Sequence, residues 1–151
     1  MKQLSKVQSA IFLLGGVLMV VGAAGFAFYR PGLLNIKGYG NCIVRITSWL
    51  FLIGTVLFSV IQAMQIYEGK SLVIIRLKKI QNVANILFVL AGISMVDTVY
   101  SFILRWFENP QIYYSFFSGK WIVLMLIAAL LELYTTHRIS AELKKEIAKK
   151  Y

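Results

Sequence analysis

Four long apolar stretches follow one another along this chain, separated by short segments in which polar and charged residues gather. No water reaches the hydrocarbon core of a bilayer, so an isolated apolar stretch can pair its backbone amides only by forming a helix. Such a helix needs about 20 residues to cross that core. The predicted spans are residues 7–29, 46–67, 83–103 and 118–137. The pattern therefore predicts one all-α domain over residues 1–151, an integral membrane four-helix bundle.

The polar segments carry an uneven distribution of positive charge. Eleven of the 16 Lys and Arg residues lie before the first span, between the second and third spans, or after the fourth. Four of the other five lie in the two remaining connections, and the fifth, Lys120, lies at the outer edge of the fourth span. Cytoplasmic loops are enriched in Lys and Arg, so both termini are predicted to face the cytoplasm. The expected location is the cytoplasmic (inner) membrane, crossed several times.

Composition agrees with a membrane location. Apolar residues make up 59% of the chain and charged residues 15%, whereas soluble domains have roughly 45–50% and about 25%. These values exclude a disordered chain, a disulfide-rich secreted fold and a water-soluble enzyme. A net charge of +10 is typical of nucleic-acid binding, but these cations flank apolar stretches and form no basic face with interleaved aromatic residues. We therefore expect contact with anionic headgroups on the cytoplasmic side and no nucleic-acid partner.

The first span could also be a signal peptide. Lys2 and Lys6 precede it, and Gly25-Phe26-Ala27 has the small-x-small form of a cleavage site. The apolar stretch that begins at Val7 is longer than the 7–15 residues usual for such a segment. We expect a retained anchor, with cleavage as the alternative.

Three segments outside the spans have a character of their own. Residues 71–80 mix apolar and basic positions and are predicted to lead along the membrane interface into the third span. In residues 138–151, Ile139, Leu143 and Ile147 recur every four residues among Lys and Glu. This spacing predicts a short amphipathic cytoplasmic extension that lies on the membrane or on a partner. Aromatic residues crowd the stretch 106–121, which favours an interfacial belt over a platform for a ligand or partner.

Residues 12–18 and 51–57 resemble each other at an offset of 39. Their sequences, Phe-Leu-Leu-Gly-Gly-Val-Leu and Phe-Leu-Ile-Gly-Thr-Val-Leu, indicate either a duplicated helix or the general likeness of apolar helices. The stretch Trp49–Phe58, with the basic linker and the Phe-containing span that follow, resembles the small bacterial YrhK-like membrane family. That resemblance covers about a fifth of the chain, and it implies a small membrane protein without pointing to an activity.

Three glycines of the first span, Gly15, Gly22 and Gly25, fall near one helical face. Small residues let two helix backbones approach closely, which is how helices associate in lipid. These glycines therefore predict helix packing, either within the chain or against another subunit.

Asp97 is the most informative residue of the third span. A carboxylate inside the bilayer costs about 2.5–3.5 kcal/mol on insertion scales, so it is a functional-site hypothesis by default. Ser94 and Ser101 are expected on its helical face, and Thr98 borders it. One interpretation is structural, with Asp97 protonated or paired with Arg45, Lys120 or Arg105. The others are a relay for protons or cations and docking to a partner helix.

Glu132 of the fourth span is the second intramembrane acid. Gln62 and Gln65 are expected at a similar depth, together with Asn82 and Asn85, and interhelical hydrogen bonds among them would satisfy the carboxylate. Arg138 and Lys6 are alternative partners. Glu132 and Asp97 are predicted to lie roughly 10–15 Å apart along the membrane normal, too far for a catalytic pair, although they could be two stations on one ion path.

The inventory of reactive side chains is short. His137 is the only histidine and Cys42 the only cysteine, which excludes bis-histidine haem ligation, a CxxC couple and an intrachain disulfide. We predict no catalytic residue, no cofactor and no metal site. The expected function is that of a non-catalytic accessory, assembly or regulatory subunit of a membrane complex, acting as a homo-oligomer or with a membrane-protein partner. The alternative is a small transporter or channel that uses Asp97 and Glu132.

Overall fold

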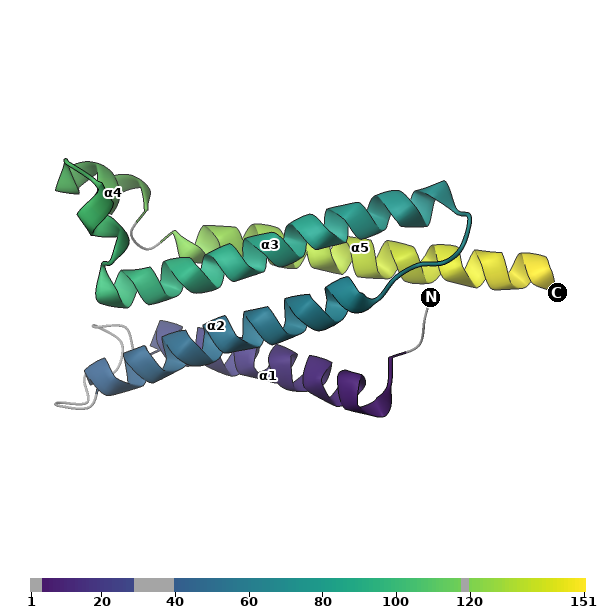
Figure 1. Ribbon diagram of the computed structural model, residues 1–151, viewed down its shortest axis with the longest axis horizontal. Coiled ribbons are helices and arrows are strands. Elements are labelled where there is room, and N and C mark those ends of the chain that lie inside the picture. The colour runs from purple at the N-terminus through teal and green to yellow at the C-terminus, as the bar shows by residue number, and fades with distance from the viewer. Residues whose placement is uncertain (1–3, 29–39, 118–119) are drawn as a thin grey trace.

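The computed structural model describes residues 4–28, 40–117 and 120–151. Helices fill most of these ranges, and no residue within them is in a strand. Figure 1 shows the elements in order: α1 (Lys6–Phe28), α2 (Gly40–Met64), α3 (Leu72–Tyr100), the 3₁₀ helix η1 (Ile103–Trp106), α4 (Pro110–Phe116) and α5 (Trp121–Lys150).

Four helical stretches are long and apolar enough to cross a membrane, which confirms the prediction of an all-α protein with four candidate spans. They are α1, α2 from Cys42, α3, and the stretch Pro110–Lys150 that contains α5.

The bounds of the helices differ from the predicted spans in several places. α3 begins at Leu72, not at residue 83, because Ile74 and Leu77 are buried and continue its apolar face. The interfacial segment 71–80 is thus largely the first part of α3. α2 begins at Gly40, ahead of the predicted residue 46, and ends at Met64. The predicted end at Tyr29 and the predicted start at Ser118 lie outside the described residues.

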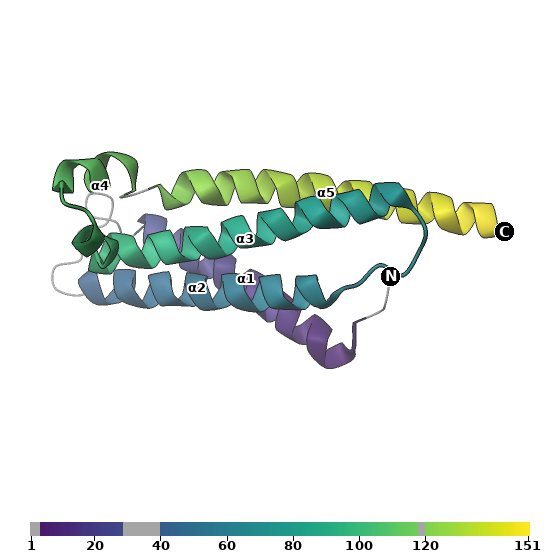
Figure 2. The same ribbon diagram turned by 45° about the horizontal axis from the view of Figure 1, so that its top comes forward.

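The helices form two antiparallel pairs, α1 with α2 and α3 with α5, and the pairs are joined where α2 packs on α3. One end of the bundle carries α4. The other, here called the terminal end, carries the start of α1, the α2–α3 connection and the C-terminus of α5 (Figures 1 and 2).

Glycines bring α1 and α2 into close contact. A Cβ atom on Gly22 would lie 2.7 Å from the backbone nitrogen of Phe51, and one on Gly15 would lie 2.9 Å from that of Phe58. Gly25 faces Thr47 in the same way, at 2.5 Å from its Cγ2. All three glycines predicted to pack helices therefore face α2 of the same chain.

The contact between α1 and α2 is reciprocal. Gly15 and Gly54, which match at the offset of 39, face each other. Gly15 also meets Leu57 and Phe58, and Gly54 meets the equivalent residues of α1, Leu18 and Met19. A local two-fold axis thus relates the resembling segments, while their origin by duplication stays a prediction.

All four long helices meet near the α4 end. Phe26 of α1, Phe51 of α2, Ala91 and Met95 of α3, and Trp121 of α5 form one buried apolar cluster. The Trp121 ring lies edge-on to Phe26, with centroids 5.2 Å apart. α1 and α5 thus meet at this end and diverge toward the terminal end (Figure 2).

The C-terminal part of α5 packs partly on its own chain. Ile139 and Leu143 contact the cluster formed by Ile74 and Leu77 of α3, whereas Ile147 is exposed. The Tyr67 hydroxyl donates to Glu146 at 2.6 Å. The apolar residues of the segment 138–151 are expected from the sequence to lie on the membrane or on a partner. Two of them, Ile139 and Leu143, pack on α3 of the same chain instead, and Ile147 stays exposed.

Candidate functional site

Asp97 closes the last turn of α3. Its side chain is 2% exposed, yet both carboxylate oxygens have hydrogen-bond donors. The Tyr113 hydroxyl of α4 donates to Oδ2 at 2.6 Å, and the backbone N–H of Ile103 donates to Oδ1 at 2.9 Å. The carboxylate therefore holds η1 and α4 against the end of α3, and its burial is compensated.

Ser101 is not on the helical face of Asp97, contrary to the prediction. α3 ends at Tyr100, and Ser101 has a φ of 52°, in the left-handed region. Its backbone N–H donates to the carbonyl of Asp97 at 2.6 Å, a closure typical of helix C-termini. Thr98 stays on the helix, where its hydroxyl donates to the carbonyl of Ser94 at 2.8 Å.

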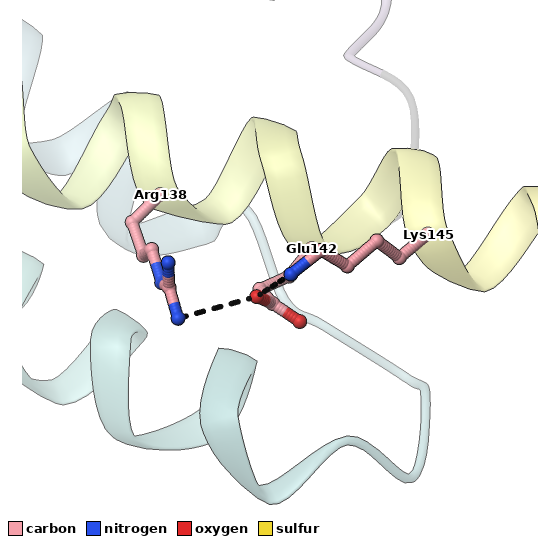
Figure 3. A network of polar contacts seen from close by, with 3 residues as sticks. All are labelled: Arg138, Glu142 and Lys145. Atoms are coloured by element: carbon pink, nitrogen blue, oxygen red, sulfur yellow. Dashed lines mark hydrogen bonds and ion pairs between the residues drawn. The ribbon is translucent and has the colours of Figure 1, made fainter.

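The cations considered as partners of Asp97 are not its hydrogen-bond donors. Within the described ranges, the ion pairs are those of Glu142, with Arg138 at 3.5 Å and Lys145 at 3.0 Å, as Figure 3 shows. A phenol and a backbone amide have taken the place of Arg45, Lys120 and Arg105 because the turn at Ser101 brings the chain back over Asp97. Lys120 and Ser94 do share with Asp97 the lining of a cavity of about 470 Å³.

Glu132 is held by amides and a hydroxyl. Its Oε1 accepts from Nε2 of Gln62 in α2, from Nε2 of Gln81 in α3 at 3.1 Å, and from the Thr136 hydroxyl one turn along α5 at 3.0 Å. Three helices thus converge on one carboxylate oxygen. The arrangement resembles the interhelical hydrogen bonding expected for polar side chains in lipid.

Gln81 and Lys78 are the residues of this site that the sequence reasoning missed. Lys78 Nζ donates to Oε1 of Gln81 at 2.8 Å, which orients the amide so that its nitrogen faces Glu132. Gln81 shares a buried face with Leu77, Ala84 and Phe88. Their spacing of three and four residues is visible in the sequence once α3 is taken to begin before residue 83.

Two acceptor atoms of the site have no hydrogen-bond partner among the described residues. They are Oε2 of Glu132 and Oε1 of Gln62, and both are buried. Gln62 cannot exchange its nitrogen and oxygen, because its oxygen would then face the carboxylate. A buried acceptor without a donor costs about 1–3 kcal/mol. The Glu132 site therefore has acceptors that lack hydrogen bonds, whereas both oxygens of Asp97 have them.

A groove of about 560 Å³ opens at Glu132, here called the Glu132 groove. It is lined by Phe12 of α1, by Phe58, Gln62 and Gln65 of α2, by Gln81 of α3, and by one face of α5 from Glu132 to Ile147. Its lining includes residues of both α1 and α5, two helices that diverge toward the terminal end (Figure 2).

Among the other candidate partners of Glu132, Gln65 joins the groove just beyond the end of α2. Asn82 is exposed. Asn85 is buried at 4% exposure, and its side-chain amide has no partner within the described residues. Arg138 turns instead to Glu142. The polar residues thus divide into a bonded cluster at Glu132 and a separate buried amide at Asn85.

The chemistry of the groove is that of a binding site. Apolar walls surround one carboxyl group and the amides that hold it, a composition common in small-molecule sites. In the described part of the chain, no three His, Cys, Asp or Glu side chains come together to hold a metal ion.

No family model, curated protein or solved structure matches this chain. The resemblance to the YrhK-like family therefore stays an expectation from the sequence.

Proposed function

We propose that this is a non-catalytic, multi-pass protein of the cytoplasmic membrane that serves a membrane complex as an accessory, assembly or regulatory subunit. The observation that carries the proposal is the Glu132 groove, in which a carboxyl group is fixed by donors from three helices while one of its oxygens is left unpartnered. A carboxyl group that is held in place and has one oxygen without a hydrogen-bond donor favours a role in binding a partner.

The proposed orientation places the terminal end in the cytoplasm. Ten of the 13 Lys and Arg residues that the structure describes lie toward that end, and the positive-inside rule supports a cytoplasmic side for such an excess. In this orientation the Glu132 groove lies in the cytoplasmic leaflet, and α5 continues past it as a cytoplasmic extension near anionic headgroups.

The test is purification in mild detergent with measurement of mass and co-purifying proteins. We expect a stoichiometric membrane-protein partner or a defined homo-oligomer that is lost in Glu132→Gln and kept in Asp97→Asn, provided that both variants remain folded. An assembly that neither substitution changes contradicts the role of the groove in recognition.

The alternative function is a small transporter or channel that uses Asp97 and Glu132. Asn85 favours this alternative, because its buried side-chain amide has no partner within the described residues and polar side chains inside membrane spans mark ion and substrate paths. Asp97 gives it less support, since both of its oxygens are occupied. Proteoliposome flux that disappears in Glu132→Gln, with the fold intact, would favour transport over an accessory role.

A further inference from the structure

We propose that the Glu132 groove binds a lipophilic primary amine, a membrane-soluble molecule with one ammonium headgroup and a hydrocarbon tail. This inference deepens the proposed function by naming a ligand class for the same groove. It rests on that proposal only in taking the groove as a recognition site.

The shape of the groove suits a ligand that enters sideways from the bilayer. α1 and α5 touch through Phe26 and Trp121 near the α4 end and leave the groove between them farther along. Phe12, Phe58 and Leu133 give it apolar walls. A hydrocarbon tail in such a groove replaces lipid contacts with protein contacts, so the polar floor decides which headgroup is held.

The floor requires a hydrogen-bond donor. Oε2 of Glu132 and Oε1 of Gln62 are both acceptors without partners, and their side chains are joined by a hydrogen bond. Both oxygens are buried, so the side chains of the floor must shift to admit a headgroup. A primary ammonium, with three N–H donors and a positive charge, can then donate to both oxygens and neutralise the carboxylate. A trimethylated ammonium has the same charge and no N–H, and it can satisfy neither acceptor by hydrogen bonding.

Depth favours a free amine over the headgroup of an aminophospholipid. Glu132 comes six residues before Arg138, about 9 Å along the helix, and so lies below the level of the headgroups in the proposed orientation. The phosphate next to a phospholipid amine would have to follow it to this depth. Lys144, the cation that lines the groove, lies about 18 Å along α5 from Glu132, too far to accompany such a phosphate closely. Lys78 is nearer, but it is not among the lining residues and its ammonium donates to Gln81.

The test is binding of dodecylamine to the purified full-length protein in nonionic-detergent micelles, followed by calorimetry. Dodecyltrimethylammonium serves as the matched probe without N–H donors. We expect dodecylamine to bind at least about tenfold more tightly, a ratio that corresponds to one charge-assisted hydrogen bond. Equal affinities for the two amphiphiles would overturn the proposal.

Two neutralising substitutions locate the effect. Glu132→Gln is expected to remove the preference for dodecylamine, and Asp97→Asn, which neutralises the other intramembrane acid, is expected to keep it; circular dichroism checks that both are folded. Unchanged binding in Glu132→Gln would mean that the carboxyl group is not the anionic site of the groove, and would overturn the inference. Complete competition by an aminophospholipid but not by a choline phospholipid would overturn the choice of a free amine.

The inference and the proposed function fail in different ways. Loss of amine selectivity in Glu132→Gln, with the co-purifying assembly unchanged, supports the ligand and contradicts the role of the groove in assembly. An assembly that depends on Glu132, in a protein without amine selectivity, contradicts the ligand alone.

Discussion

Asp97 and Glu132 are both carboxyl groups set among apolar side chains, but the structure uses them differently. Asp97 lies near the α4 end with one donor on each oxygen. Glu132 lies nearer the terminal end with three donors on one oxygen and none on the other. The comparison teaches that burial alone does not mark a functional acid. The informative property is whether the fold completes the hydrogen bonds of the carboxylate.

Asp97→Ala is expected to cause the largest loss in the free energy of unfolding. The substitution removes the side-chain acceptor of the Tyr113 hydroxyl and of the Ile103 N–H. A buried or part-buried donor without an acceptor costs about 1–3 kcal/mol, which gives a loss of about 2–6 kcal/mol for the two. Unfolding in mixed SDS and dodecylmaltoside micelles measures it. Stability equal to that of the unmodified protein would show that Asp97 does not hold η1 and α4.

A second prediction concerns the α1–α2 contact that supports one wall of the Glu132 groove. Gly22→Ala places a Cβ 2.7 Å from the backbone nitrogen of Phe51, and such overpacking costs about 1–3 kcal/mol. Gly16→Ala is the matched control, because its Cβ would meet only Phe58 at 4.0 Å, and we expect a change within about 0.5 kcal/mol. The same unfolding assay compares them, and equal losses would contradict the glycine contact.

Tyr113→Phe tests the Asp97 site with a smaller change. It removes only the hydroxyl that donates to Oδ2, and a hydrogen bond to a charged group contributes about 1.5–3 kcal/mol, of which we expect the lower part here. Tyr114→Phe is the control, since the Tyr114 side chain is exposed. Should both variants unfold alike, the phenol would not be a partner of Asp97 that matters for stability.

The smallest predicted effect concerns the attachment of the C-terminal part of α5. Burial, and next the hydrogen bond to Glu146, raise the pKa of Tyr67 above its usual value. The neutral phenol therefore stabilises the contact at all pH values below about 10, and the contact is lost as the pH rises through the raised pKa.

Spin-label mobility reports on this attachment. With a label at Ile147→Cys in a Cys42→Ser background, mobility should rise only above pH 10. In Tyr67→Phe it should be higher at neutral pH and lack that alkaline step. An alkaline step of the same size in Tyr67→Phe would assign the titration to other groups.

The sequence predicts one of these sites better than the other. Counting residues along the spans puts Gln62 at the depth of Glu132, and the structure joins the two. The sequence does not predict Gln81 as part of the site, because three cations, Arg76, Lys78 and Lys79, interrupt the apolar pattern and place the predicted start of the third span after it. In the structure Ile74 and Leu77 already belong to the buried face of α3. The spans themselves follow from apolar length, which depends on local sequence alone.

The partners of Asp97 could not be predicted in the same way. They depend on the left-handed turn at Ser101, at a position with neither glycine nor proline to signal it. The nearest signal is Asn109-Pro110, where the Asn109 side chain accepts from the Gln111 N–H and begins α4. The packing of α4 on α3 is a tertiary contact, and the local hydrophobic periodicity of a sequence predicts secondary structure but not such contacts.

Parallel measurement of the unfolding free energies of Asp97→Asn and Glu132→Gln, in the same micelles, tests the central claim most directly. Asp97→Asn weakens bonds that are complete in the fold, so we expect a loss of about 1–3 kcal/mol. Glu132→Gln replaces Oε2, a buried acceptor without a donor, by an amide nitrogen and so removes that unmet acceptor, and we expect unchanged stability or a gain of up to about 1 kcal/mol. A loss in Glu132→Gln as large as that in Asp97→Asn would contradict the division of roles between the two acids.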